Sequence, residues 1–404
     1  MELKPAKKLL IISSGQPSLN PRLVKEADAL AEAGYQVTVV YAYWNDWGTT
    51  FDETLIPSKK WKAVRAGGDP HNKKAAWFLS RIIHKLAKIT GRPAELAIAR
   101  AGYHLMTEAL RYRADLYIGH NLGALAATVT AAKAAKKPCG FDAEDFHRNE
   151  VSDDKDHPDV LLKTRLENKY FPQLDYLIAS SPQIADAYQH LFPDKKPVVI
   201  RNVFPKDMRV NEPALNQSGP IRLFWFSQTI GTQRGLQDVI KALAVLNDQP
   251  FELHLVGYCS AEVKASLTTN TSVSIRFHAP LAPDDLALFA SQFDIGLALE
   301  PGFNINNNLA LSNKIFTYLQ AGLSIIASDT EAQSSFIGAY PGIGKVYKRG
   351  DIRSLAEMLL YYHKNRGELL ETRKTALTLA REKLNWEEEQ KKLLALVKDT
   401  LDQY

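Results

Sequence analysis

The sequence predicts an α/β protein of two successive domains, each built around a parallel β-sheet. Short apolar runs of strand length alternate with amphipathic segments of helix length through most of the chain. A polar segment at residues 211–220, NEPALNQSGP, separates two such series. The 404 residues, 45% of them hydrophobic, are enough for two or three hydrophobic cores. We therefore expect two Rossmann-like domains with a cleft between them.

The first half opens with a β-α-β unit, which is typical of a doubly wound sheet. Residues 9–13 predict the first strand, 23–33 a helix that Gly34 ends, and 36–41 the second strand. The pattern continues with alternating strands and helices. The further strands are expected at 116–119, 138–142, 176–179 and 197–200, and the further helices at 122–135, 161–171 and 182–190.

The second half repeats this alternation after the linker. Its strands are expected at 221–226, 251–256, 274–278, 294–299 and 323–328, and its helices at 235–246, 283–291 and 386–401. Ser312 stands at an N-cap position, and Gly322 stands where a helix would end, so another helix is expected between them. The Asn-rich segment just before Ser312 is expected to be a loop without repetitive structure.

The stretch 294–329 therefore reads as strand, loop, helix and strand. In a parallel sheet such a unit directs the free N–H groups of the helix N-terminus, and here also Lys314, toward the carboxyl edge. Anions, and phosphates above all, bind at such a position. A lysine in the first helical turn opposes the helix dipole at a cost of roughly 0.3–1 kcal/mol, which a bound diphosphate would compensate. The alternative is an ordinary surface lysine.

Composition limits the compartment and the partners. No apolar run approaches the length of about 18 residues that a membrane-spanning helix needs, and residues 9–13 are too short for a signal peptide. Cys139 and Cys259 form no pair or metal-binding motif, so a reducing cytosol is expected. The pair Asp154 and Asp156 is interpreted as a solvated acidic loop rather than a metal site.

Basic residues concentrate in one part of the chain. Residues 58–113 hold 13 Lys and Arg, although the whole chain has a net charge of only +5. Within them, Ala75–Ile89 forms a basic amphipathic pattern. Two interpretations stay open: a domain helix with its apolar face in the core, or a helix that contacts an anionic membrane or a lipid acceptor. Nucleic-acid binding is not expected, because no RNA- or DNA-binding module surrounds the segment.

The segment around Lys314 resembles a known sequence pattern. Asn313, Lys314, Phe316, Tyr318, Ala321 with Gly322, and Ala327 resemble the donor-binding element of GT-B glycosyltransferases, in particular the retaining GT4-like group (glycosyl transferases group 1). The resemblance implies an N-terminal acceptor-binding domain at 1–210 and a nucleotide-sugar-binding domain at 211–385. It also implies a helix at 386–404 that packs on the first domain.

The resemblance also implies donor-binding residues. In the loop 227–235, Arg234 matches the second phosphate-binding cation of the family, while Gln228 replaces the first; Gly231 and Gly235 give the loop free amides that suit a diphosphate. Arg234 as a surface arginine is the alternative.

Thr317 stands where the family has a ribose-binding glutamate. Leu309 and Thr317 replace the two carboxylates of the family's E-x7-E pair, so Glu300 either substitutes for one of them or caps the loop. Ser312, Asn313 and Lys314 complete the expected donor set.

Three turns of the first half supply the remaining candidates. His120 follows a strand in a turn resembling the family's active-cleft turn, with a structural histidine as the alternative. Glu144 takes the place of the family histidine that contacts the transferred sugar, and we expect Glu144 and Asp145 to be catalytic. Acceptor contacts are expected from three residues: Gly15 in the loop after the first strand, Arg22 near the first helix, and His147. The loop 13–16 lacks the His or Asp base common in inverting enzymes, which favours retention.

The sequence thus predicts a metal-independent, retaining glycosyltransferase without a cofactor. It would move a sugar from a UDP- or GDP-sugar to a glycan or lipid-linked acceptor in cell-envelope or exported polysaccharide synthesis. It would act in the cytoplasm, at the inner face of the membrane if Ala75–Ile89 binds lipid. Two alternatives stay open: a nucleotide-sugar epimerase of the same fold, and a non-catalytic nucleotide-sugar-binding protein.

Overall fold

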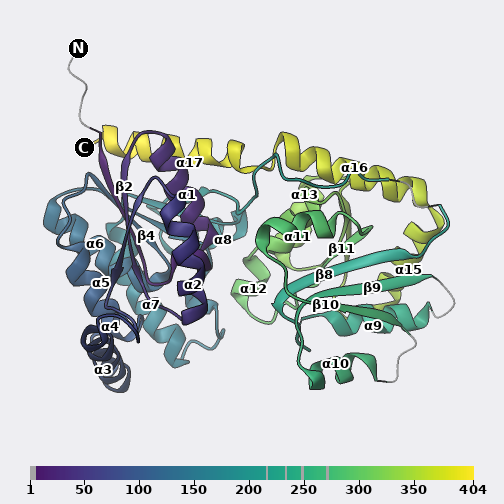
Figure 1. Cartoon of the computed structure of the whole chain (residues 1–404), viewed down its shortest axis with the longest axis horizontal. Helices are drawn as coiled ribbons and strands as arrows, with labels where there is room; N and C mark the ends of the chain where they lie inside the picture. Colours follow the sequence, from purple (N-terminus) through teal and green to yellow (C-terminus); the bar gives the residue numbers. More distant parts are fainter. Residues whose placement is uncertain (1–5, 215–216, 233, 247–249, 270–272) are drawn as a thin grey trace, which may run out of the picture. The chain divides into compact units, whose positions relative to one another are not determined.

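The computed structural model describes residues 6–214, 217–232, 234–246, 250–269 and 273–404 (Figure 1). The chain divides into two compact units. The first, unit 1, comprises Met1–Arg201 and Gln390–Tyr404, and the second, unit 2, comprises Asn202–Glu389. Each unit contains one parallel sheet with helices around it, which confirms the predicted α/β class. Residues 215–216 of the linker and Gln233 of the predicted phosphate loop lie outside the described residues.

The boundary between the units lies upstream of the expected linker. The Phe204 carbonyl accepts a hydrogen bond of 2.9 Å from the Trp386 amide. The Pro205 carbonyl accepts one of 2.8 Å from the side-chain amide of Gln320. Both donors belong to unit 2, so the segment that follows Arg201 is already part of that unit.

Unit 1 holds a seven-stranded sheet in the order β3-β2-β1-β4-β5-β6-β7. Neighbouring strands pair in parallel throughout. Its strands are β1 Lys8–Ser13, β2 Gln36–Ala42, β3 Lys62–Ala66, β4 Leu116–His120, β5 Cys139–Ala143, β6 Tyr176–Ala179 and β7 Val198–Val199.

The helices of unit 1 cover both faces of this sheet. In Figure 1, α5 and α6 lie on one side of the strands and α1 on the other. The helices are α1 Pro21–Glu32, α2 Asp46–Leu55, α3 Lys74–Thr90, α4 Ala94–Ala97, α5 Gly102–Ala109, α6 Leu125–Ala135, α7 Pro158–Tyr170 and α8 Pro182–Leu191. Of the elements between β2 and β4, the sequence indicated only α3.

Local signals fix the start of α1. Asn20 occupies the N-cap, and its side-chain oxygen accepts from the Leu23 amide at 3.0 Å. Pro21 follows at the first helical position, where its missing N–H costs nothing. Leu23 and Leu30 then face the interior with no measurable exposure. These features hold α1 against the sheet. They therefore also fix the positions of its polar residues, Arg22 and Glu26.

Unit 2 holds a six-stranded parallel sheet in the order β10-β9-β8-β11-β12-β13. Its strands are β8 Ile221–Thr229, β9 Phe251–Tyr258, β10 Ser274–His278, β11 Ile295–Ala298, β12 Ser324–Ser328 and β13 Gly344–Tyr347. In Figure 1, α11 and α13 lie on one side of this sheet and α9 and α10 on the other. The core includes Leu223, Leu253, Leu297 and Leu355, all fully buried.

The helices of unit 2 complete its sequence of elements. They are α9 Leu236–Val245, α10 Ala261–Thr268, α11 Pro283–Ala290, α12 Ile305–Leu309, α13 Asn313–Gln320, α14 Glu331–Ala339, α15 Ile352–Lys364 and α16 Arg366–Glu382. A last helix, α17 Trp386–Asp402, begins in unit 2 and ends in unit 1. None of the described helices is both long and apolar enough to cross a membrane.

Two local expectations need correction. The Asn-rich segment was expected to lack repetitive structure, but it contains α12, because the Asn304 side chain caps this short helix by accepting from the Asn307 amide at 2.7 Å. Strand β8 was expected to end at Phe226 and instead continues to Thr229. A register shift against β9 between these two residues allows the extra pairing.

A close contact joins α13 to the sheet of unit 2. The Tyr318 ring lies over Gly296 of β11, where a Cβ atom would come within 2.3 Å of the ring. The Tyr318 hydroxyl donates to the Leu297 carbonyl at 2.9 Å, and the side chain is fully buried. Gly296 therefore sets how closely α13 approaches the sheet.

We predict that Gly296→Ala destabilises unit 2 by about 1–3 kcal/mol, because the added methyl group overlaps the buried Tyr318 ring. The measurement is the free energy of unfolding in urea. Gly338→Ala is the matched control, because Gly338 of α14 has no atom within 4 Å of its Cβ position. The control should leave stability unchanged or raise it slightly. Equal effects of both changes would contradict the packing role of Gly296.

Candidate functional site

A pocket of about 510 Å³ opens in unit 2 where the carboxyl ends of β8, β11 and β13 meet the start of α9. Its volume suits a small-molecule ligand, and the carboxyl edge of a parallel sheet is where such ligands bind. It is lined by Thr232, Gly235, Gln237, Asp238, Leu299, Glu300, Pro301, Phe303, Tyr347 and Arg349. Two of the predicted donor-binding residues, Gly235 and Glu300, are among them.

Gly235 brings the start of α9 against the end of β11. It is the N-cap of α9 and has a φ of 74°, in the left-handed region that favours glycine. A Cβ atom on it would lie 2.3 Å from the Leu299 carbonyl oxygen. Only glycine fits both the backbone conformation and the space, so this position shapes one wall of the pocket.

Arg349 supplies a cation at the pocket that sequence reasoning missed. Its Nε donates to Asp329 at 2.7 Å, and its Nη1 donates to the Pro301 carbonyl at 3.0 Å. Gly302 follows with a φ of 63°, and a Cβ there would overlap the guanidinium. These contacts hold Arg349 in place while leaving it partly exposed. Its partners are 20 and 48 residues away in sequence, so no local sequence motif identifies Arg349 as a pocket residue.

Glu300 and Lys314 form an ion pair of 2.8 Å directly after β11. The Ser312 hydroxyl also donates to the Glu300 carboxylate, at 2.7 Å. Burial opposes ionisation of this carboxylate, but Lys314 and the hydrogen bonds outweigh it and lower the pKa of Glu300. The anion that compensates Lys314 in the first turn of α13 is therefore a carboxylate of the protein itself.

The N-terminus of α13 has no side-chain cap. Ser312 occupies the N-cap position, but its hydroxyl is used as a donor to Glu300 and does not accept from the helix. The N–H groups of the first turn are thus left without the usual side-chain acceptor. Together with Lys314, they form an anion-binding position that Glu300 partly occupies.

The other predicted donor-binding residues do not line the pocket. Gln228 and Arg234 are exposed, and Asn313 is exposed at the start of α13. Gly231 is only partly buried. Thr317 is 3% exposed within α13, which favours helix packing over the expected ribose contact.

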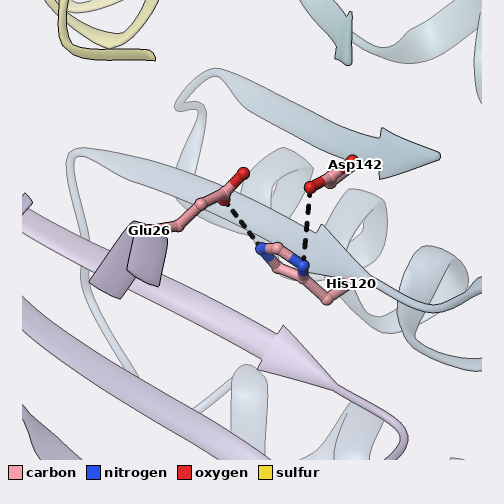
Figure 2. Close-up of side chains that lie close together, drawn as sticks. All are labelled: Glu26, His120 and Asp142. Atoms are coloured by element: carbon pink, nitrogen blue, oxygen red, sulfur yellow. Dashed lines mark hydrogen bonds and ion pairs between the residues drawn. The ribbon is translucent and has the colours of Figure 1, made fainter. Parts of the chain in front are cut away.

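In unit 1, a cluster of titratable side chains lies beneath the ends of β4 and β5. Figure 2 shows His120 between Glu26 and Asp142. Its Nε2 is 2.8 Å from a Glu26 oxygen, and its Nδ1 is 3.8 Å from Asp142. Burial opposes protonation of the imidazole, but Glu26 and Asp142 outweigh it and raise the pKa of His120. His120 is only 2% exposed, which favours its structural interpretation over direct contact with a substrate.

Arg22 completes this cluster. Its Nε donates to Asp142, and its Nη1 donates to the Ile200 carbonyl at 2.7 Å. The residue is 1% exposed, so the structure does not offer it to an acceptor as the sequence had predicted. With His120 protonated, two cations balance two carboxylates. Although the ligand atoms of Glu26, His120 and Asp142 lie within 4.8 Å of one another, the adjacent guanidinium suits internal ion pairs better than a divalent metal ion.

Two groups with pKa values near neutrality lie beside this cluster. Burial, reinforced by Asp145, raises the pKa of the Glu144 carboxyl to about 7. Burial and the Arg22 charge lower the pKa of Lys25 to about 7. Glu144 and Asp145 are half-buried after β5. A carboxyl group of this pKa changes its charge close to physiological pH.

His147, a predicted acceptor contact, is held inside unit 1. Its Nδ1 lies 2.5 Å from Glu150, and the amide of His147 donates to the Tyr188 hydroxyl at 2.9 Å. Burial opposes protonation, yet the Glu150 carboxylate raises the pKa of His147 to about 9. Lys163 binds the other Glu150 oxygen at 2.5 Å. The imidazolium thus belongs to a buried charge network.

The remaining predicted acceptor residue, Gly15, lies in the turn after β1. The Ser13 hydroxyl lies within hydrogen-bond distance of the Gly15 carbonyl, at 3.1 Å, and of the Asn121 side chain, at 3.0 Å, and its one hydrogen can be donated to either. Asn121 itself has a φ of 62°, which is uncommon outside glycine. The loops after β1 and β4 are therefore tied together, and the strained Asn121 was not recognised from the sequence.

No protein-family model and no curated protein matches this chain. Solved structures do match it. Sucrose-phosphate synthase from Thermosynechococcus elongatus aligns with a TM-score of 0.73 at 14% identity, over 98% of this chain and 100% of that chain. HepE from Anabaena in complex with UDP-glucose gives 0.68 at 13% identity, over 97% and 100%. A glycosyltransferase from Rickettsia africae gives 0.68 at 14% identity, over 98% and 99%. The chain therefore has the fold of these proteins, the GT-B fold.

We predict that the His147 network makes stability depend on pH. Because the folded state raises the pKa of His147 from 6.5 to about 9, its stabilising effect is complete below pH 6.5 and is lost as the pH rises through 9. The loss should amount to about 3 kcal/mol. Chemical unfolding at several pH values should show this slope in the wild type but not in His147→Gln. His190→Gln, at an exposed position of α8, should keep it; a slope retained in His147→Gln would refute the assignment.

Proposed function

We propose that this protein is a glycosyltransferase that takes a sugar from a nucleotide-sugar donor, and that unit 2 binds the donor. The main observation that supports this proposal is the pocket of about 510 Å³ at the carboxyl edge of the unit 2 sheet. It occurs in a chain with the fold of HepE, whose structure contains UDP-glucose. The pocket is large enough for the nucleoside part of such a donor.

The diphosphate is proposed to bind at the start of α13. Three features support this position: the uncapped N–H groups, the Lys314 ammonium and the short distance from Lys314 to Glu300 at the pocket wall. Arg234 and Arg349 are the further cations that we assign to the donor phosphates. Stabilising the negative charge that develops on the leaving diphosphate is the main catalytic task in such a transfer.

In this proposal Glu300 has two states. Without donor it neutralises Lys314, as the ion pair of 2.8 Å records. With donor, the phosphate takes its place at Lys314, and the released carboxylate accepts hydrogen bonds from sugar hydroxyl groups. Glu300 thereby fills the role of the carboxylates that Leu309 and Thr317 replace.

We propose that the transfer retains the configuration of the sugar and needs no metal ion. The acceptor hydroxyl forms its bond to the anomeric carbon on the same face from which the bond to the diphosphate breaks, so no protein nucleophile is required. The departing phosphate accepts the proton of that hydroxyl, so no protein base is required either. We assign Glu144, whose carboxyl pKa burial raises to about 7, to the binding of the acceptor in unit 1. The proposed acceptor is a glycan or lipid-linked sugar of a cell-envelope or exported polysaccharide.

The transfer reaction is tested directly by product analysis. The protein is incubated with UDP- and GDP-sugars, with and without candidate acceptors, and free nucleoside diphosphate is measured. We expect its release to require an acceptor. Interconversion of two nucleotide sugars without release would instead identify an epimerase. Donor binding without either reaction would identify a non-catalytic binding protein.

We predict opposite effects for the two partners of the ion pair. Lys314→Met should weaken UDP binding by about 10- to 100-fold, because a charge-assisted phosphate contact is lost. Glu300→Gln should strengthen UDP binding several-fold, because Lys314 no longer has an internal partner. Calorimetric titration with UDP measures both.

Lys241→Met, at an exposed position of α9, is the control and should bind UDP as the wild type does. The double variant with Lys314→Met and Glu300→Gln avoids a buried unpaired charge, and it should still bind weakly. If this double variant binds UDP as tightly as the wild type, Lys314 is not a phosphate ligand.

We predict that Glu144→Gln lowers kcat/KM by roughly 10- to 100-fold and removes a transition near pH 7 from its pH profile, because the titrating carboxyl is lost. Initial rates across pH measure both. Asp156→Asn, on an exposed loop, should preserve rate and profile. An unchanged transition in Glu144→Gln would assign it to another group.

A further inference from the structure

Helix α3 packs on unit 1 with one narrow face. Ser80 and Ala87 are the buried residues of this helix. The Ser80 hydroxyl lies 2.6 Å from the His104 ring of α5, and the His84 ring bonds the Leu96 carbonyl of α4 at 3.0 Å. These positions recur at intervals of three and four residues, so they define a single stripe along the helix. The rest of the helix surface is less buried than this stripe.

The opposite face of α3 is apolar and exposed. Phe78, Ile82, Leu86 and Ile89 recur at intervals of three and four residues, and they are between 41% and 72% exposed. Leu79, at the edge of this stripe, is 45% exposed. The sequence analysis left open whether the apolar side of this segment enters the core. In the structure most of its large apolar side chains point away from the core, and such contiguous patches mark interaction surfaces.

A basic stripe borders this apolar face. Lys74, Arg81, Lys85 and Lys88 are separated by seven, four and three residues, so they lie along one side of the helix. The helix contains no Asp or Glu. The three lysines are exposed, whereas the Arg81 guanidinium lies 4.3 Å from the centre of the Trp77 ring. An apolar stripe beside a purely cationic stripe is the arrangement of a helix that lies in a membrane interface.

We propose that α3 docks unit 1 onto a lipid bilayer that contains anionic lipids. Phe78, Ile82, Leu86 and Ile89 enter the boundary between headgroups and acyl chains, and Lys74, Lys85 and Lys88 bind the lipid phosphates. The charge complementarity selects this occupant, because an uncharged apolar partner would leave the cationic stripe unused. The inference is independent of the proposed transfer reaction.

The start of α2 lies near the segment that precedes α3. Asp46, the first residue of α2, lies 3.2 Å from His71, which precedes α3 by a short turn. Trp47 and Phe51 of α2 form an edge-to-face pair with ring centres 4.7 Å apart, and both are about half exposed.

The test is flotation of the full-length protein with vesicles, without any sugar nucleotide. The wild type should float with vesicles of phosphatidylcholine and phosphatidylglycerol, and much less with phosphatidylcholine alone or at raised salt. The triple variant Lys74→Glu, Lys85→Glu and Lys88→Glu should bind roughly 100-fold more weakly. Phe78→Ser with Ile89→Ser should bind at least about tenfold more weakly, because apolar area is lost.

The matched control reverses three exposed lysines elsewhere: Lys155→Glu, Lys241→Glu and Lys398→Glu. It has the same net charge as the α3 triple variant and should float like the wild type. Circular dichroism verifies that every variant is folded. The proposal is overturned if both triple variants lose flotation equally, if the Phe78 and Ile89 variant floats like the wild type, or if the wild type does not float.

Light scattering separates the main alternative. Self-association of the wild type that the Phe78→Ser and Ile89→Ser changes abolish, without any effect on flotation, would make α3 a dimer interface and overturn lipid docking. A failure of lipid binding leaves the transferase proposal intact, because UDP binding is measured separately.

Discussion

Parallel pairing of all neighbouring strands brings the strand ends of each sheet to one edge, and the chemistry of both units depends on it. In unit 1, Ser13 is in register with His120, and His120 is in register with Asp142. Three strands far apart in sequence thus place polar side chains side by side. In unit 2, Ala298 pairs with Ala327 at the same kind of edge, and Glu300 follows just beyond it. Loops can vary there without disturbing the sheets that support them.

Buried charges in unit 1 are balanced within the protein. Arg22 and His120 face Glu26 and Asp142, and His147 and Lys163 share Glu150. Removing one member of such a set leaves an uncompensated charge, which is more damaging than removing the whole set. The cluster around His120 therefore fixes the relative positions of α1, β4 and β5, while Glu144 beside it keeps a carboxyl group that titrates near neutral pH.

The sequence predicted correctly those elements that local sequence patterns determine. The strands at 176–179 and 274–278 coincide with β6 and β10, and the helix begun by Ser312 ends at Gly322 with a positive φ of 64°, as its position indicated. Strand β3 escaped notice because it lies at the sheet edge and is only partly buried, so its apolar pattern is weak. The charge pairs escaped for a different reason: Glu26 and His120 are 94 residues apart, and only tertiary structure joins them.

The Lys314–Glu300 pair has a consequence for which anions the cell can load into unit 2. A helix terminus with an unpaired lysine attracts small anions. Here the Glu300 carboxylate is paired with Lys314, so an anion must displace it in order to bind. Under the proposed function, a donor with two adjoining phosphates and a nucleoside in the neighbouring pocket displaces this carboxylate, whereas a single small anion does not. In that proposal, the internal ion pair disfavours the binding of small anions at the donor site.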